Sequence, residues 1–551
     1  MRDVIKNKKS YEVVRDQQSY IDSRLFAASV VLFFSIILLS FRLWFIQIYK
    51  GPYYLEISQA NRVRRVEIVA PRGRIYDRDN RIILGNKRMY DLVYIPQYVK
   101  DKKSTLEILT NLVHMPYEVL ERKTKAFRSQ VKFEPITLKK SLTSHERALV
   151  ESYKHLMPGV EIQAVPKRFY NDDINVHLIG YLREHNFARG VRESDGYRYL
   201  PGDLSGKKGL ELIWEKYLRG QRGYDYIQVD ALGRKINPSI YGVDLFLSKE
   251  KEKSGSDLHL TIDWDLQIAA QKAFTGKYGA VVILNPQNGQ VLGLVSSPWY
   301  NPRIYQGELT EDRWQMLVNN PFKPFFDKTT GGLFSPGSLF KPVVALAALE
   351  EGILKPESKS FCSGKYQVGS QTFHCHRRAG HGHVSLKEAM LYSCDTFFYS
   401  LGIELGLDKI GKYAEDFYLG HKLGLNLNRE RAGLIPSKGW KQQRYRRYVS
   451  KGDLANMSIG QGDLLMTPIQ LATFYATIAN GGYVWRPYLV DQVKNSGKVL
   501  VQGESKLLHK VKHIKPENLH LMRNLLLASV DDPRSTGRRA KLPYTTVAGK
   551  T

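Results

Sequence analysis

The chain has 551 residues and carries 82 Lys and Arg against 54 Asp and Glu, a formal net charge of +28. A chain of this length exceeds a single hydrophobic core, so two or more domains are expected. With 43% hydrophobic and 25% charged residues, it is globular and not intrinsically disordered. The basic excess does not indicate nucleic-acid binding, because no recognition motif accompanies it. It is consistent with attraction to anionic lipid headgroups or with a solvated basic surface.

The first expected element is a membrane-spanning helix over residues 25–48. Residues 25–41 carry no charge and the apolar run continues past Arg42, which is long enough to cross a bilayer. A cleaved signal peptide and a buried core helix are the alternatives. The run is longer than a signal h-region, and no small-x-small cleavage site follows promptly. Residues 1–24 hold six basic and four acidic side chains, so the positive-inside rule places this tail in the cytoplasm and the bulk of the chain outside.

Residues 49–250 are expected to form a first domain of mixed α/β content without a catalytic motif. The alternation from Val63 to Val69 predicts a strand. Arg72–Asn80 predicts a tight turn, and residues 103–131 and 143–156 predict helices.

The polar run Lys249–Asp257 predicts a linker, which separates the first domain from a second one over residues 251–551. The second domain begins with two apolar runs within residues 279–297. They surround the turn-forming residues Asn285–Gly289 and therefore predict a β-hairpin.

Ser338 and Lys341 form the most informative pair of this second domain. Pro336-Gly337 predicts a turn, and the apolar run Val343–Leu349 predicts a helix, so Ser338 is expected at the start of a helix with Lys341 one turn later on the same face. A serine hydroxyl is a weak nucleophile until a base takes its proton. Lys341 acts as that base only when it is neutral, which requires burial or a second cation to lower its pKa.

The three cysteines of the chain, Cys362, Cys375 and Cys394, all follow within one short stretch, together with several histidines. An odd number of cysteines fits a simple disulfide framework poorly. Three thiolates and one imidazole are a common closed zinc shell, and we choose His381 as the fourth ligand. One Cys362–Cys375 disulfide with a buried third thiol remains the alternative. A zinc ion with four protein ligands is structural, because no position is left for an activated water.

Two further strings complete an ordered set with the Ser338–Lys341 pair. They are Ser393-Cys394-Asp395 and the final residues Lys550-Thr551. S-x-x-K alone recurs by chance in long chains. S-x-x-K, S-x-D and the beginning of K-T-G in this order match the motif set of class A β-lactamases and penicillin-binding proteins.

The stretches around the motifs resemble class B penicillin-binding proteins over nearly the whole chain after residue 20. They include RGRIYDRDN, KGLELIWEKYLRGQRG, DKTTGGLFSPGSLFKP and SIGQGDLLMTPIQLATFYATIANGG. WKQQRYRR and Asp395 in place of Asn are most similar to the elongation type, penicillin-binding protein 2. Asp327-Lys328 and Phe334-Ser335 depart from the usual pattern.

The resemblance implies a membrane-anchored α+β multi-domain protein. Residues 49–250 would be the pedestal, or dimerisation-type, domain. Residues 251–551 would be a serine β-lactamase-like transpeptidase domain with helices packed on an antiparallel sheet. The implied protein sits in the cytoplasmic membrane with its bulk outside. Its implied partners are peptidoglycan stem peptides, β-lactams, a SEDS-family glycosyltransferase and other elongation-complex membrane proteins. No cofactor is implied for catalysis.

The resemblance also implies the site residues. Ser338 would attack the penultimate D-Ala carbonyl, Lys341 would take its proton, and Ser393 would relay it. Lys550 would support Ser393, Thr551 would bind the terminal carboxylate, and Asp395 would orient Lys341 or its loop. Cys362, Cys375, His381 and Cys394 would align with a zinc site of elongation-type relatives.

Several alternatives remain open at the level of sequence. A division-type class B transpeptidase, a β-lactamase, a β-lactam sensor and a non-catalytic scaffold share some of these features. Because the chain stops at Thr551, inside the third motif, we expect a C-terminally incomplete catalytic domain, either a fragment of a longer product or an inactive form.

Overall fold

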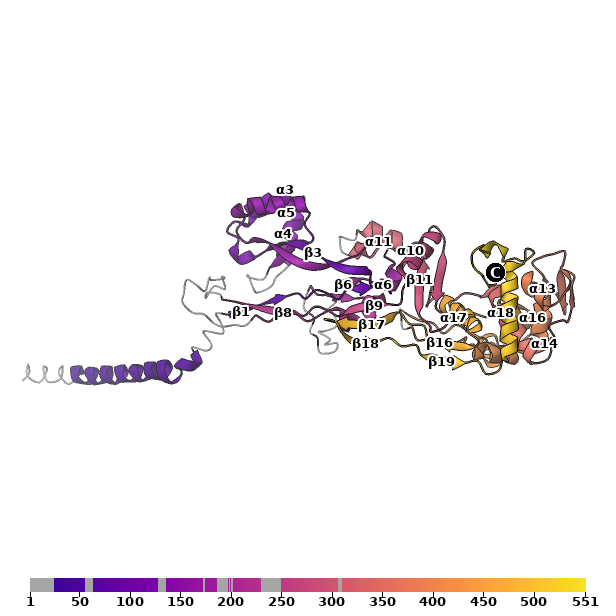
Figure 1. The fold of residues 1–551 in the computed structure, drawn as a ribbon. Helices are drawn as coiled ribbons and strands as arrows, with labels where there is room; N and C mark the ends of the chain where they lie inside the picture. The colour runs from indigo at the N-terminus through magenta and orange to yellow at the C-terminus, as the bar shows by residue number, and fades with distance from the viewer. Residues whose placement is uncertain are drawn as a thin grey trace, which may run out of the picture.

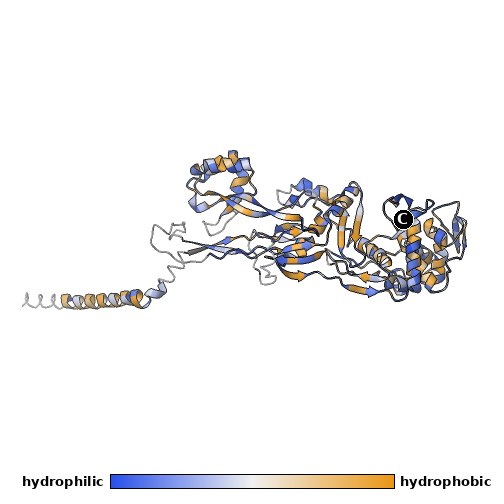
Figure 2. Cartoon of the chain, in the orientation of Figure 1, coloured by the Kyte–Doolittle hydropathy of each residue, from blue (hydrophilic) through white to orange (hydrophobic). Residues whose placement is uncertain are grey.

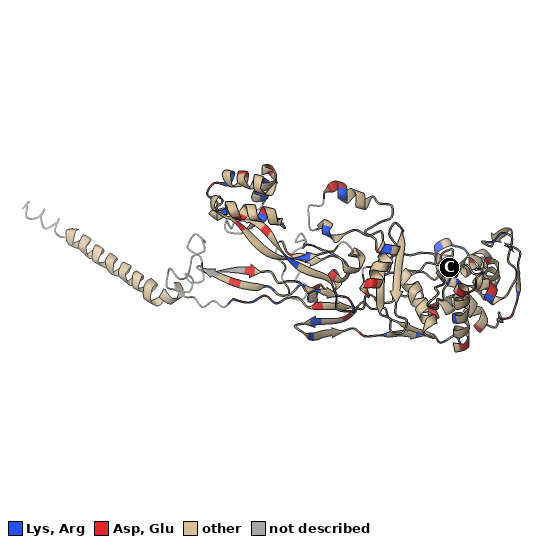
Figure 3. Cartoon of the chain, turned by 45° about the horizontal axis from the view of Figure 1, so that its top comes forward, with Lys and Arg blue, Asp and Glu red and all other residues tan. Residues whose placement is uncertain are grey.

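The molecule is elongated, with its N-terminal helix at one end and its C-terminal elements at the other (Figure 1). The computed structural model describes residues 24–54, 63–126, 135–171, 174–185, 197, 199, 202–228, 249–305, 310–425, 427 and 429–551. The predicted tail, apart from Arg24, lies outside these residues. Acidic and basic residues are interspersed along the body (Figure 3).

The N-terminal helix spans Arg24–Tyr49 and is long and apolar enough to cross a membrane by length and composition. Its last residues form a short π-helix, η1 (Phe45–Tyr49). Most of its large apolar side chains are exposed, and Figure 2 shows that hydrophobic residues recur along the helix. The helix coincides with the span predicted from residues 25–48.

The first half of the chain, up to residue 250, contains strands and short helices in its described part. Its strands are β1 (Val63–Ile68), β2 (Ile75–Tyr76), β3 (Ile82–Tyr94), β4 (Ile136–Lys139), β5 (Val160–Phe169), β6 (Leu182–Glu184), β7 (Leu204–Gly206) and β8 (Gly223–Gln228). Its helices are η2 (Pro96–Tyr98), α3 (Lys102–Val113), α4 (Tyr117–Ala126), α5 (Ser144–Tyr153), η3 (Lys154–Leu156), α6 (Val176–Ile179), α7 (Gly209–Ile213) and α8 (Glu215–Leu218).

A small lobe of α3, α4 and α5 lies at the end of the long β3–β5 ribbon (Figure 1). Its own core contains Leu106, Leu109 and Leu120. The helix expected over residues 103–131 is two helices, because His114 adopts a left-handed conformation (φ +52°) and ends α3. Residues 127–131 lie outside the described part. The capping box of Thr143 and Glu146 begins α5 where a helix was predicted.

The second half of the chain carries the remaining elements. Its strands are β9 (Asp257–Leu260), β10 (Gly279–Leu284), β11 (Val291–Ser297), β12 (Ser360–Cys362), β13 (Lys365–Val368), β14 (Gln371–His374), β15 (Gly382–Val384), β16 (Tyr483–Trp485), β17 (Val490–Asn495), β18 (Lys498–Gln502) and β19 (Leu507–Lys510). Its helices are α10 (Trp264–Ala273), η5 (Pro302–Tyr305), α11 (Glu311–Val318), η6 (Gly337–Phe340), α12 (Lys341–Glu350), α13 (Leu386–Leu391), α14 (Asp395–Asp416), α15 (Lys438–Tyr445), α16 (Lys451–Ser458), α17 (Pro468–Ala479), α18 (Pro516–Asp531) and η7 (Arg538–Ala540).

One seven-stranded sheet crosses the predicted boundary at residues 250 and 251. Its order is β18-β17-β9-β2-β3-β4, with β5 also paired to β3. The short strand β2 runs parallel to β9, and β9 runs antiparallel to β17. The two halves of the chain are therefore joined by backbone hydrogen bonds as well as by the linker.

The predicted hairpin of residues 279–297 is present as β10 and β11. Helix α17 packs on β10 and α10 packs on β11. Helix α12 is buried along almost its entire length, from Lys341 to Ala348, and it packs against α14, which packs in turn against α16. Of the predicted site residues, Lys341 is the first residue of α12, Ser338 lies in η6 directly before it, and Ser393 lies just before α14.

A buried ionic network joins the segment RGRIYDRDN, which contains Arg72, to the segment KGLELIWEKYLRGQRG, which contains Glu211 and Glu215. Glu211 is fully buried and accepts from Arg168 Nε at 2.7 Å and from Arg72 NH2 at 2.6 Å. Arg72 also reaches Glu215 at 2.7 Å, and Arg168 donates to the carbonyl of Gly73 at 2.6 Å. Burial alone would raise the pKa of Glu211, but the two arginines lower it below its usual value.

Glu211→Leu is expected to lower the free energy of unfolding by about 3 to 5 kcal/mol, because it removes the carboxylate that the buried Arg168 binds and one of the two carboxylates that Arg72 binds. Urea unfolding of the full chain measures this loss. The matched control is Glu107→Leu on α3, where the side chain is 57% exposed and the change is expected to stay within about 0.5 kcal/mol. Equal stability of the two variants would contradict a structural role for the network.

Candidate active site

Ser338 lies in η6, directly before the buried helix α12. Gly337 has a positive φ of +58°, which a glycine adopts at little cost, and this turn brings Ser338 to the start of the helical segment. Pro342 occupies the first turn of α12, where the missing N–H costs no intrahelical hydrogen bond. The 3₁₀ turn followed by the α-helix places Lys341 three residues after Ser338, as the spacing predicted.

Lys341 is completely buried, and its ammonium group has three acceptors. Nζ donates to the carbonyl of Ser393 at 2.8 Å, to Ser393 Oγ at 3.2 Å and to Asp395 Oδ1 at 2.8 Å. Burial lowers the pKa of Lys341, and this effect outweighs the opposing pull of Asp395. A lysine in this environment loses its proton at a lower pH than a surface lysine does.

Ser393 connects the lysine to the first serine. Its hydroxyl donates to Ser338 Oγ at 2.9 Å while it accepts from Lys341. The hydrogen-bonded path from Lys341 to Ser338 therefore runs through Ser393. Ser393 has a φ of +52°, a left-handed conformation that is unfavourable for serine and that is typically retained at functional sites. The bond from Lys341 to the Ser393 carbonyl stabilises this conformation.

Asp395 begins α14 and joins Lys341 to the segment that follows β14 and contains Cys375 and His376. Its Oδ2 accepts the backbone N–H of His376 at 2.9 Å. Burial alone would raise the pKa of Asp395, but Lys341 and the hydrogen bonds hold it below its usual range. The carboxylate is thus charged and fixed from two sides. The His376 imidazole also lies near this carboxylate, with Nδ1 3.5 Å from Asp395 Oδ2. The sequence did not indicate His376 as a site residue, because its position beside Asp395 depends on the fold.

Lys550 and Thr551 differ in their neighbours: Lys550 is influenced by Lys341, whereas Thr551 lies beside Thr536. Burial, and then the charge of Lys341, lower the pKa of Lys550 to about 7, so the two amines lie close enough to influence each other. Lys550 Nζ donates to the carbonyl of Thr551 at 2.9 Å. Thr551 Oγ1 is 2.7 Å from Thr536 Oγ1, so its hydroxyl contacts the segment after α18.

Two supporting contacts were also missed from the sequence. Gly460 accepts the backbone N–H of Gly337 at 2.9 Å, and a Cβ at Gly460 would lie 2.0 Å from the Gly337 carbonyl oxygen. Only glycine fits there. Tyr475 donates to the carbonyl of Leu339 at 3.2 Å. The stretch from Ser458 to Gly482 contains both residues, but its letters alone do not indicate which of them touch the serine turn.

The four predicted metal ligands meet in one cluster. The ligand atoms of Cys362, Cys375, His381 and Cys394 all lie within 4.8 Å of one another. His381 Nδ1 is 3.6 Å from both Cys362 Sγ and Cys375 Sγ. With ordinary zinc–sulfur and zinc–nitrogen bond lengths, two ligands of a tetrahedral ion lie about 3.6 Å apart. The donor set and its spacing therefore fit a tetrahedral zinc ion.

The three cysteines are free and buried, so the alternative Cys362–Cys375 disulfide is not formed in this structure. A hydrogen bond from Cys394 lowers the pKa of the Cys375 thiol, which favours the thiolate form that binds metals. Because Cys375 precedes His376 and Cys394 lies between Ser393 and Asp395, this cluster fixes both sides of the Asp395 carboxylate.

Comparison with known proteins identifies the family of both halves of the chain. Residues 67–260 match the penicillin-binding protein dimerisation domain, and residues 279–551 match the penicillin-binding protein transpeptidase domain. The chain is 30% identical over 516 residues to the peptidoglycan D,D-transpeptidase MrdA of Haemophilus influenzae, and the match covers 91% of this chain and 77% of that protein.

Two solved structures are similar over most of the molecule. The penicillin-binding protein PBP2 of Helicobacter pylori, solved in complex with MreC, has a TM-score of 0.75 at 24% identity and covers 89% of both chains. A structure of a peptidoglycan synthase complex, described as coordinating polymerisation and crosslinking, has a TM-score of 0.65 at 27% identity. It covers 92% of this chain and 85% of the other.

Proposed function

We propose residue roles for a chain that belongs to the class B penicillin-binding proteins and is a peptidoglycan D,D-transpeptidase of the MrdA type. The relationship to MrdA favours the elongation type over the division type. The observation that supports the roles is the hydrogen-bonded chain from buried Lys341 through Ser393 to Ser338.

The first half-reaction is acylation of Ser338. Its Oγ attacks the penultimate D-Ala carbonyl of a donor stem peptide while its proton passes through Ser393 to neutral Lys341. The Ser338 amide lies in the first turn of η6, where helical N–H groups lack an intrahelical acceptor and are available to an oxyanion. When the C–N bond breaks, the proton returns through Ser393 to the nitrogen of the departing D-Ala.

The second half-reaction transfers the peptide. The amine of an acceptor stem peptide attacks the acyl-enzyme, its proton passes along the same path, and Ser338 recovers its own proton as the ester breaks. Lys550, with its pKa near 7, supports the Ser393 hydroxyl electrostatically. Thr551 binds the terminal carboxylate of the donor. A β-lactam follows the first half-reaction only, and its ring-opened amide nitrogen stays attached.

The direct test of this function is incubation of the chain with a peptide ending in D-Ala-D-Ala and a labelled D-amino acid acceptor. The expected result is release of one D-Ala for each labelled product formed. Hydrolysis without transfer would indicate a carboxypeptidase or a β-lactamase instead. Absence of both products together with absence of penicillin binding would indicate a non-catalytic scaffold.

Asp395→Asn is expected to shift the pH dependence of acylation. Acylation requires neutral Lys341, so the rate rises as pH passes upward through the pKa of Lys341. Asp395 opposes the lowering of that pKa. Removal of its charge should therefore move the half-maximal rate to lower pH by about one to three units.

A fluorescent penicillin, followed between pH 5 and 9, measures this shift. The matched control is Asp408→Asn on the same helix, whose side chain is 66% exposed, and its profile should coincide with that of the parent. An unchanged midpoint in Asp395→Asn, or a shift to higher pH, would contradict the role of Asp395.

Cys362, Cys375, His381 and Cys394 bind a structural zinc ion in this proposal. A bound ion would hold the segments of Cys362, Cys375 and His381 against the start of α14, and proton transfer would involve only the residues named above. Its ligands position the backbone of His376 and the Ser393–Asp395 segment, which in turn orient Lys341. No other cofactor is needed for the reaction.

Cys394→Ser is expected to lower bound zinc from about one ion per chain and to slow acylation by about 10- to 100-fold, as loss of supporting groups at metal sites typically does. Zinc is measured by plasma mass spectrometry and acylation with a fluorescent penicillin. Cys394 is buried, so a circular dichroism spectrum accompanies both measurements. Parent protein that contains no zinc yet acylates at full rate would contradict this role.

The N-terminal helix serves as a single membrane anchor in the cytoplasmic membrane, with residues 1–24 in the cytoplasm and the bulk outside. This placement rests on the length and composition of the helix and on the positive-inside rule. The partners of the protein in this proposal are a SEDS-family glycosyltransferase and other membrane proteins of the elongation complex. The similarity to a subunit of a peptidoglycan synthase complex supports this assignment. Nucleic acid is not a partner.

A further inference from the structure

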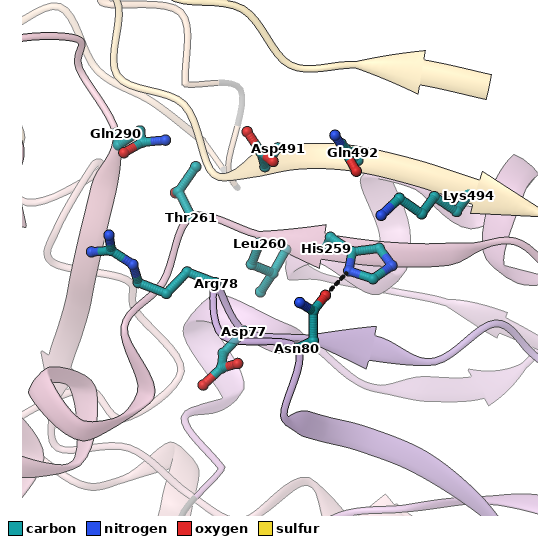
Figure 4. Close-up of a pocket in the computed structure, with 10 residues that line it drawn as sticks. All are labelled: Asp77, Arg78, Asn80, His259, Leu260, Thr261, Gln290, Asp491, Gln492 and Lys494. Atoms are coloured by element: carbon teal, nitrogen blue, oxygen red, sulfur yellow. Dashed lines mark hydrogen bonds between the residues drawn. The ribbon is translucent and has the colours of Figure 1, made fainter. Parts of the chain in front are cut away.

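A cavity of about 260 Å³ lies in the seven-stranded sheet, where the two halves of the chain meet (Figure 4). The turn between β2 and β3 supplies Arg78 and Asn80. Strand β9 supplies His259, and β17 supplies Asp491 and Lys494. None of these residues has a role in the reaction proposed above. The volume is just below the range of small-molecule pockets, about 300–1,000 Å³, which suits a ligand about the size of one sugar unit.

The turn that supplies Arg78 and Asn80 is held by hydrogen bonds within the protein itself. Asp77 is fully buried and accepts the backbone N–H groups of Asp79 at 2.9 Å and of Arg81 at 2.7 Å. Its other oxygen accepts from Arg81 Nε at 2.7 Å. This carboxylate therefore closes the turn that presents Arg78 and Asn80. Ligand binding does not have to bear the entropy of ordering the turn.

His259 offers a hydrogen-bond acceptor in the cavity. Its ring stacks flat on Tyr76, with centroids 4.8 Å apart and an interplanar angle of 6°. Its Nδ1 lies 2.9 Å from Asn80 Oδ1, an acceptor oxygen, so Nδ1 carries the proton. Burial, and then the charge of Lys494, lower the pKa of His259, so the imidazole is neutral near pH 7. Its Nε2 is then an acceptor.

The cavity combines donors with acceptors and positive with negative charge. Arg78 and Lys494 donate, Asp491 and the His259 Nε2 accept, and the amide of Gln290 does both. An anion would be attracted by the two cations but repelled by Asp491. A neutral ring with several hydroxyl and acetamido groups matches the whole set, because each of its groups both donates and accepts.

We propose that this cavity binds one amino-sugar unit of the peptidoglycan glycan strand. The proposal rests on the transpeptidase function, which brings such strands to the protein. Strands β9 and β17 lie in the middle of the elongated molecule, between the N-terminal helix and the helices α14 and α16 beside the catalytic serines (Figure 1). A strand that is made at the membrane and cross-linked at the far end passes along this body. A sugar site halfway holds it in line with Ser338.

The test is isothermal titration of the full chain in lipid nanodiscs with glycan strands freed of their stem peptides. Saturable binding by the parent is expected, with at least tenfold weaker binding by Lys494→Met and by His259→Phe. His259→Phe keeps the stack on Tyr76 and removes only the ring nitrogens. The matched control, Lys498→Met on the neighbouring strand β18, removes an exposed cation outside the cavity and should bind like the parent. Circular dichroism shows whether each variant is folded. If only one of Lys494→Met and His259→Phe folds, that variant alone is sufficient for the test.

Absence of saturable binding by the parent, or parent-like affinity of the folded variants, would overturn the sugar site. Competition by inorganic phosphate would also overturn it, since it would identify an anion site. Failure of the parent to react with penicillin overturns the proposed reaction instead, because glycan binding is measured without any use of Ser338.

Discussion

Ser338→Ala is expected to abolish covalent labelling of the chain by a fluorescent penicillin. The acyl-enzyme is an ester of the Ser338 oxygen, so no labelled product forms without that atom. The loss is expected to be complete in a gel-based assay, whereas non-covalent binding of the drug persists. Ser338 is only partly exposed, and its side chain makes one hydrogen bond, with Ser393 Oγ, so the variant should fold.

The matched control is Ser335→Ala, three residues earlier. Ser335 is exposed and has no place in the hydrogen-bonded chain, so labelling should equal that of the parent. Labelling of Ser338→Ala at the parent's rate would show that another residue is the nucleophile.

Lys341→Met is expected to slow acylation by about 10² to 10⁴, the usual contribution of a positioned general base. Methionine keeps most of the length and the apolar contacts of the lysine stem, so the core of α12 is preserved. It removes the amine that receives the proton through Ser393. The substitution also leaves the Asp395 carboxylate without its buried counter-ion, which raises the pKa of Asp395.

Stopped-flow or quenched labelling with a penicillin measures this rate. Lys355→Met, at an exposed position after the same helix, is the control for removal of a positive charge. A Lys341→Met variant that acylates within a factor of about three of the parent would contradict the proton path, since proton transfer by a positioned group contributes far more.

The sequence predicted the parts of the fold that depend on local pattern. The uncharged run of residues 25–41 indicated the long N-terminal helix, and alternating apolar residues indicated β1. The turn residues Asn285–Gly289 indicated the hairpin of β10 and β11. The Pro-Gly turn and the apolar run beyond it placed Ser338 and Lys341 on one helical segment. Each of these follows from the periodicity or conformational preference of neighbouring residues.

Contacts between segments far apart in the sequence could not be predicted from it. The pairing of β9 with both β2 and β17 joins segments about 180 and 230 residues apart, and no local pattern indicates which strands meet. A single helix over residues 103–131 was wrong, since the preference of Met115-Pro116 for an extended chain was not weighed against the surrounding helix-forming residues.

The site shows the same division between local and distant information. Ordered motifs placed Ser338, Lys341 and Ser393 in one site, but they did not indicate that Ser393 stands between the other two. The contact between Asp395 and the backbone N–H of His376 also could not be predicted from the sequence, because every residue type except proline offers that donor. The Cys/His cluster could be predicted from the sequence, because cysteine and histidine side chains grouped in one stretch are themselves the pattern that indicates a metal site.

The most direct measurement is peptide mass spectrometry of the chain after reaction with benzylpenicillin. We expect one penicilloyl group per chain, attached to the peptide that contains Ser338. Its formation should slow as pH falls, because Lys341 becomes protonated. An adduct on any other residue, or none at a pH where Lys341 is neutral, would contradict this expectation.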